Sequence, residues 1–144
     1  MRLQRLFLSL LVLPALMCSS ACTNPLSDLF GGPTTPSSSS STTDTFSGTL
    51  APSGSLSFTF SVATAGTVAV TLTAVSPATN GPLGLGVGPS SNGSCTIANS
   101  TSGATAAGSP QLSATENPGN YCVKVSDAGT LAAASTVTVT VSHP

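Results

Sequence analysis

The sequence predicts an all-β domain, an antiparallel β-sandwich of the Greek-key or jelly-roll type, behind a disordered N-terminal tether. Apolar residues alternate with Ser and Thr, turn-forming residues separate the alternating runs, and no window carries a helical apolar stripe. The stretch Asp44 to Pro144 has 101 residues, enough for one core. About seven or eight strands are expected, and a closed barrel is the alternative.

Residues 1–21 have the pattern of an export signal. Arg2 and Arg5 give it a basic start, and the uncharged apolar run Leu6 to Met17 follows. This run has 12 residues, whereas a helix that spans a membrane needs roughly 20. The segment is therefore predicted to be a cleaved signal peptide.

Two processing routes fit the residues that end this segment. Ordinary signal peptidase can cut after Ala21, which would give a secreted protein. Alternatively, Ser19-Ser20-Ala21-Cys22 resembles the bacterial lipoprotein signal, in which a small residue precedes an acylated cysteine, although Ser19 stands where that pattern prefers Leu. The resemblance implies that Cys22 is the lipid attachment site and that membrane lipid anchors the protein in the cell envelope. Thr23 after the cysteine favours the outer membrane if the host has one.

The cysteine count favours lipid attachment. Cys18 leaves with the signal, and Cys95 and Cys122 lie in the predicted domain, where an exported protein normally pairs them as a disulfide. That bridge would close a loop of 28 residues and contribute roughly 3.5 kcal/mol on the chain-entropy model. Cys22 then has no partner, and thioether attachment gives it a chemical use. A firm anchor needs more than one acyl chain.

Residues 22–43 form the Ser/Thr/Pro-rich tether. This stretch includes the run Ser37 to Ser41 and has few large apolar residues, so burial cannot offset the entropy of ordering it. As a flexible coil it would span roughly 25 Å, enough to hold a small domain clear of a lipid surface.

The predicted strands of residues 44–144 share a period of two, with one apolar and one polar face. Their apolar positions are Leu56, Phe58, Phe60 and Val62; Val68, Val70, Leu72 and Ala74; Leu83, Leu85 and Val87; Tyr121, Val123 and Val125; and Val137, Val139 and Val141. Gly, Asn and Pro accept the backbone angles that turns need. They occur at Pro52-Ser53-Gly54, Ala65-Gly66, Asn80-Gly81-Pro82, Asn92-Gly93, Asn117-Pro118-Gly119 and Asp127-Ala128-Gly129.

Four segments together resemble bacterial pre-peptidase C-terminal domains, over about Asp44 to Val141. They are Asp44-Thr45-Phe46-Ser47-Gly48-Thr49-Leu50, Ser57-Phe58-Thr59-Phe60, Ala65-Gly66-Thr67-Val68 and Gly119-Asn120-Tyr121-Cys122-Val123-Lys124-Val125. The resemblance implies a β-sandwich of the kind appended to secreted enzymes, with a role in substrate or surface attachment rather than in chemistry. The family commonly has an acidic central strand, and Leu83-Gly84-Leu85-Gly86-Val87-Gly88 stands in its place, so no calcium site is carried over.

Few side chains could carry out chemistry. Apart from Tyr121 and any free thiol, the ionisable groups after the signal are Asp28, Asp44, Glu116, Lys124, Asp127 and His143. We interpret Lys124 and Asp127 as a solvated pair and His143 as part of a fraying terminus. General acid–base catalysis needs paired groups in a cleft, and no G-x-S-x-G elbow presents a nucleophile. The sequence therefore predicts a protein that is not an enzyme and has no catalytic residues.

Metal, cofactor and nucleic-acid binding are also not expected. Calcium takes six to eight oxygens, whereas the three domain carboxylates are far apart in sequence. Loss of the two arginines of the signal changes the formal net charge from −1 to −3. The single lysine that remains cannot neutralise a phosphate backbone.

Two functions remain. The first is a surface-tethered accessory or structural lipoprotein of the cell envelope. The second is a secreted or tethered binding module for an extracellular carbohydrate or protein partner, using exposed loops around Asn80 to Asn99. The low aromatic content, with Tyr121 as the only tyrosine and no tryptophan, counts against sugar binding. A groove surrounded by exposed polar side chains would favour binding, and smooth Ser/Thr faces would favour the structural role.

Overall fold

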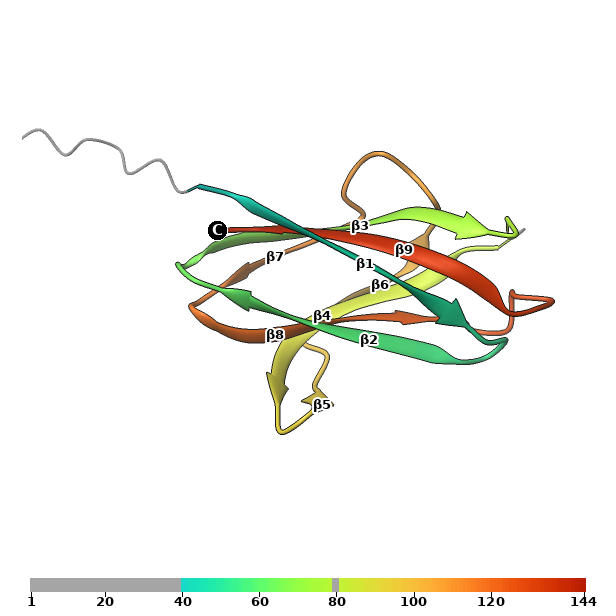
Figure 1. Cartoon of the computed structure of the whole chain (residues 1–144), viewed down its shortest axis with the longest axis horizontal. Helices are drawn as coiled ribbons and strands as arrows, with labels where there is room; N and C mark the ends of the chain where they lie inside the picture. The colour runs from blue at the N-terminus through green and yellow to red at the C-terminus, as the bar shows by residue number, and fades with distance from the viewer. Residues whose placement is uncertain (1–39, 79–80) are drawn as a thin grey trace, which may run out of the picture. The chain divides into compact units, whose positions relative to one another are not determined.

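The computed structural model describes residues 40–78 and 81–144, which form two antiparallel sheets packed face to face (Figure 1). The predicted signal peptide, the tether as far as residue 39 and the predicted lipid site Cys22 lie outside the described residues. The predicted all-β sandwich is confirmed, with nine strands rather than seven or eight.

One sheet has four strands and the other has five. The strand order in the first sheet is β1 (Thr42–Leu50), β9 (Ser135–His143), β3 (Gly66–Ser76) and β7 (Leu112–Glu116). The second contains β2 (Ser55–Val62), β8 (Gly119–Ser126) and β4 (Leu83–Ser91), with β5 (Ser94–Cys95) and β6 (Asn99–Ala104) both paired to β4. Except from β4 to β6, consecutive strands alternate between the sheets, which is the jelly-roll arrangement.

The core lies between the inner faces of the sheets. Nearly all of the apolar positions predicted from the alternation are buried there or pack against it. Two of them, Leu56 and Phe58, are only partly buried because β2 is an edge strand. Phe58 stacks on Phe46 of β1, with ring centroids 5.2 Å apart, and so helps to close this side of the sandwich.

One predicted core position is wrong. Ala74 is exposed and Val75 is partly buried, because the register of β3 against β9 shifts between Leu72 and Ala74. Thr73 is the extra residue, and a bulge of this kind turns the following side chains to the other face of the sheet.

The end of the chain is also more ordered than the sequence suggests. We expected His143 to fray, but it is the last residue of β9, pairs in register with Thr42 of β1 and is only 5% exposed. Its ring lies 5.3 Å from that of Phe60, and its Nε2 lies 3.2 Å from Asp44 Oδ2. Strand β1 begins two residues before the predicted domain boundary at Asp44, and this longer ladder holds His143 in place.

Candidate functional site

The two domain cysteines are joined. Cys95 and Cys122 form a disulfide with their Cα atoms 5.7 Å apart, which confirms the predicted pair. Disulfides persist in oxidising compartments, so the bridge indicates an extracytoplasmic location.

This disulfide fixes a short segment over the outer face of the five-stranded sheet. Cys122 faces away from the core, as its place between Tyr121 and Val123 predicts, yet it is fully buried because residues 95–98 cover it. The cover needs a glycine beneath it, since a Cβ on Gly88 would overlap the backbone oxygen of Thr96. Backbone bonds from Thr96 N to Pro89 O (3.1 Å) and from Ala98 N to Val87 O (3.0 Å) complete the attachment.

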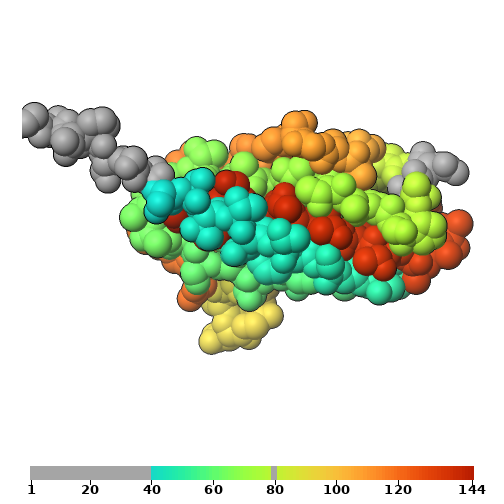
Figure 2. Space-filling model, turned by 45° about the horizontal axis from the view of Figure 1, so that its top comes forward, coloured from blue at the N-terminus to red at the C-terminus, as the bar shows by residue number. Residues whose placement is uncertain are grey.

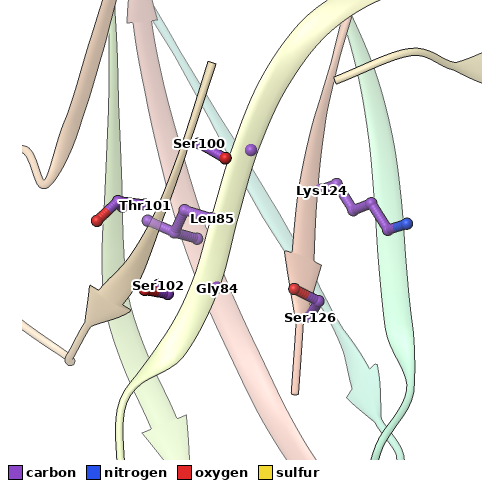
Figure 3. A pocket seen from close by; sticks show the side chains of 8 residues that line it. Gly84, Leu85, Ser100, Thr101, Ser102, Lys124 and Ser126 are labelled. Atoms are coloured by element: carbon purple, nitrogen blue, oxygen red, sulfur yellow. The ribbon is translucent and has the colours of Figure 1, made fainter. Parts of the chain in front are cut away.

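Beside this cover lies a shallow groove of about 570 Å³. Gly84 and Gly86 of β4 form its floor, because they place no side chain on the outer face of the sheet. Figure 3 shows the walls on either side of β4, with hydroxyl side chains on both. The lining side chains with polar groups are Ser100, Thr101, Ser102, Lys124 and Ser126.

Ile97 marks the covered end of the groove. Its side chain lies over Gly86, where an added Cβ would be 2.9 Å from Ile97 Cγ2. At 36% exposure it is the only large hydrophobic side chain among the described residues that counts as exposed. The groove thus combines a glycine floor, hydroxyl walls and one apolar end.

Lys124 supplies the only positive charge at the groove and is the only lysine in the chain. It pairs in register with Gly86 on β4 and with Ser57 on β2. In Figure 3 its stem extends away from β4, so its ammonium group lies at the outer rim. The one ion pair found within residues 40–78 and 81–144 is that of His143 with Asp44, which leaves Lys124 without a carboxylate partner there.

Asp127 does not form the solvated pair with Lys124 that we expected. It is 6% exposed, and its two carboxylate oxygens accept hydrogen bonds from the backbone N–H groups of Ser53, Thr130 and Leu131 and from the Thr130 hydroxyl. Burial alone raises the pKa of this carboxyl, but the hydrogen bonds outweigh burial and lower the pKa of Asp127 to about 2. The residue holds loops together and is not among the residues that line the groove.

The other titratable groups lie at the opposite end of the core strands. The Tyr121 hydroxyl donates to Asn117 O at 3.0 Å, and burial together with the Glu116 carboxylate raises the pKa of Tyr121. In the part of the chain that the structure describes, no three His, Cys, Asp or Glu residues are close enough to share a metal ion. No helix in that part is long and apolar enough to cross a membrane.

The predicted binding loops coincide with the groove only in part. Asn80 is not among the described residues, and Asn92 is in the exposed turn between β4 and β5, where its φ is 50°. Asn99 begins β6, immediately before the groove residues Ser100 to Ser102. The other sheet presents β1, β9 and β3 side by side on the face seen in Figure 2.

Sequence reasoning missed the groove itself, although a signal for it exists. In Leu83-Gly84-Leu85-Gly86-Val87-Gly88 every second residue is glycine, so one face of β4 has no side chains. The register that places serines of β6 and Lys124 beside those glycines depends on tertiary pairing and cannot be predicted from this pattern.

Comparison with known proteins adds no family to this description. The chain matches no family model, and no curated protein is significantly similar to it. The observations define a disulfide-stabilised, all-β, two-sheet domain with a polar groove on one outer face.

Proposed function

We propose that this chain is a non-catalytic protein of the cell envelope, exported and held at the surface by lipid on Cys22. Its sandwich acts as an accessory or structural module, in keeping with the resemblance to pre-peptidase C-terminal domains, which implies attachment rather than chemistry. The observation that carries the proposal is the Cys95–Cys122 disulfide, which fits the oxidising environment that the signal-like N-terminus leads to.

The exposed surface supports a role without catalysis. The described strands present mainly Ser and Thr to solvent, and the buried carboxylate Asp127 is fully engaged by loop hydrogen bonds. The pair His143–Asp44 lies at the edge of the core, where His143 is covered by Phe60. Neither of them is among the residues that line the groove, whose only titratable side chain is Lys124. General acid–base catalysis needs more than one such group in a cleft.

Intact mass spectrometry of membrane and soluble fractions tests the proposal. We expect a membrane-bound species that starts at Cys22, carries added acyl mass and lacks two hydrogens because of the disulfide. Cys22→Ala should move the protein to the soluble fraction. Cys18→Ala is the matched control, because that cysteine is removed with the signal. An unacylated, soluble wild-type protein would contradict the anchor.

The groove favours a second candidate, a binding module for an extracellular carbohydrate or protein. Its volume lies in the usual range for ligand sites, roughly 300 to 1,000 Å³. Several polar side chains line this concave surface. A smooth Ser/Thr face would instead favour a purely structural role.

A further inference from the structure

We propose that the groove between β6 and β8 binds acidic sugar units of an extracellular polysaccharide, with Lys124 pairing a sugar carboxylate. This inference rests on the second candidate function and names its ligand class. It also assigns a site, made of Gly84, Gly86, Ser100, Ser102, Lys124 and Ser126, with Ile97 at its end.

The glycine floor permits close approach of a ring-shaped ligand. Gly84 and Gly86 are paired in register with Ser126 and Lys124. Ile97 covers Gly86, so the open part of the floor is at Gly84, which is half-buried and lies beside the Ser126 hydroxyl. A sugar ring lying in the groove would approach the backbone at Gly84, and its apolar face could rest on the exposed side of Ile97.

The walls match the hydrogen-bonding character of sugars. Each serine hydroxyl can donate one hydrogen bond and accept others, as a sugar hydroxyl does. Ser100 and Ser102 come from β6 on one side of the floor and Ser126 from β8 on the other, so a ligand in the groove meets hydroxyls from both sides. An acidic peptide would offer mainly hydrogen-bond acceptors to the serine hydroxyls, so their ability to accept hydrogen bonds would be used less.

Charge rather than stacking must supply the specificity. The aromatic rings of Phe46, Phe58, Phe60 and Tyr121 all pack in or against the core, so the described outer faces offer none of them as a stacking platform for a neutral sugar. Lys124, in contrast, has no carboxylate partner within the described residues. Its four-carbon stem is flexible and can swing the ammonium from the rim toward a carboxylate in the groove. A hydrogen bond between charged groups is stronger than one between neutral groups.

The test is calorimetric titration of the full-length protein in detergent with oligogalacturonate, a polymer of sugar carboxylates. Dextran serves as the neutral sugar, poly-glutamate as the acidic peptide and phosphorylated mannan as a sugar with a different anion. We expect the strongest binding to oligogalacturonate. Lys124→Gln should weaken that binding by about 10-fold, since it removes one charge-assisted contact.

Two further variants separate a loss of binding from a loss of folding. Gly84→Val should reduce binding by narrowing the floor. The one close contact of its added Cβ is with the Ser126 hydroxyl at 2.5 Å, which can rotate away, while the backbone oxygens of Ser126 and Thr101 lie at 3.6 and 3.8 Å. Thr140→Val, on β9 of the other sheet, is the matched control and should bind like wild type. Circular dichroism of each variant verifies the fold.

Each result decides the proposal. Equal binding of dextran, preferential binding of poly-glutamate or phosphorylated mannan, or no binding of any probe would overturn it, as would unchanged affinity in Lys124→Gln. Membrane fractionation of the same preparation reports separately on the anchor, so the ligand assignment can fail while the proposed envelope role stands.

Discussion

Asp127 shows how a single side chain organises two loops. Residue Ser53 has a positive φ of 55° in the β1–β2 turn, and its N–H donates to Asp127 Oδ2 at 2.8 Å. Thr130 and Leu131, in the loop that leads to β9, donate to the same carboxylate. Asp127 N in turn donates to Gly54 O at 3.0 Å. The carboxylate thus accepts hydrogen bonds from backbone N–H groups that have no strand partner in these irregular segments.

Asp127→Asn should lower the stability of the fold and should also make that stability less dependent on pH in the acid range. Because the folded-state pKa of Asp127 lies at about 2, below its ordinary value of 3.8, the wild-type carboxylate stabilises the fold above pH 4. That contribution is lost as the pH falls through the folded-state pKa. We expect the melting temperature of wild type to fall more steeply between pH 5 and pH 2 than that of Asp127→Asn.

Thermal melts over this pH range measure the effect. Asp44→Asn is the charge-matched control, because it removes the same charge but only one hydrogen bond, that to His143. Parallel acid profiles for wild type and Asp127→Asn would show that the loop hydrogen bonds do not hold the ionised form.

Among the elements, β4 has the most unusual composition. Its inward residues Leu83, Leu85 and Val87 are 1% exposed or less, while its outward positions are glycines. The cover at residues 95–98 uses the space above Gly88 and the groove uses the space above Gly84. One strand therefore serves both the disulfide and the groove.

Cys95→Ala tests the contribution of the disulfide. We expect the free energy of unfolding to fall by about 3 kcal/mol, because the unfolded chain is no longer restricted by the bridge. Urea denaturation with and without reductant measures this change. The reduced wild type should then resemble the variant, whereas equal stability of the two proteins under oxidising conditions would mean that the bridge does not form in solution.

Strand β3 illustrates what local pattern cannot predict. Val68, Val70 and Leu72 follow the expected alternation, but the bulge at Thr73 ends it. On the other side of β3, the pairing with β7 extends only to Leu112, and the side chain of the preceding residue, Gln111, bonds to β3 instead. Its Oε1 accepts from Leu72 N at 2.8 Å, and its Nε2 donates to Thr105 O at 2.9 Å. Here a side chain replaces the backbone partner of a neighbouring strand. Local sequence cannot predict this contact, because the two residues are 39 positions apart.

At the scale of the molecule, the sequence predicted the fold class well and the site poorly. The period of two in runs such as Val137 to Val141 directly reports one buried face, because strand geometry allows no other arrangement. The disulfide followed from cysteine counting in an exported chain. The groove did not, because it depends on which strands become neighbours of β4, and that order is set by the packing of the whole sandwich.

Deletion of residues 23–39 should leave the domain folded, since every described strand begins after residue 41. The β-type circular dichroism and the melting temperature of this variant should match those of the intact protein. Extending the deletion through Leu50 removes β1, uncovers the edge of β9 and should abolish cooperative melting. Loss of structure in the shorter deletion would show that the segment belongs to the fold.

The position of Lys124 has a practical consequence for chemical labelling. Because the chain has no other lysine, an amine-reactive reagent can modify only this side chain and the N-terminal amine, and acylation of a processed N-terminus would remove the second target. A photoactivatable cross-linker placed on Lys124 would therefore carry its reactive group at the rim of the groove and at no other side chain. The molecules that it captures on living cells would come from the immediate surroundings of that one surface.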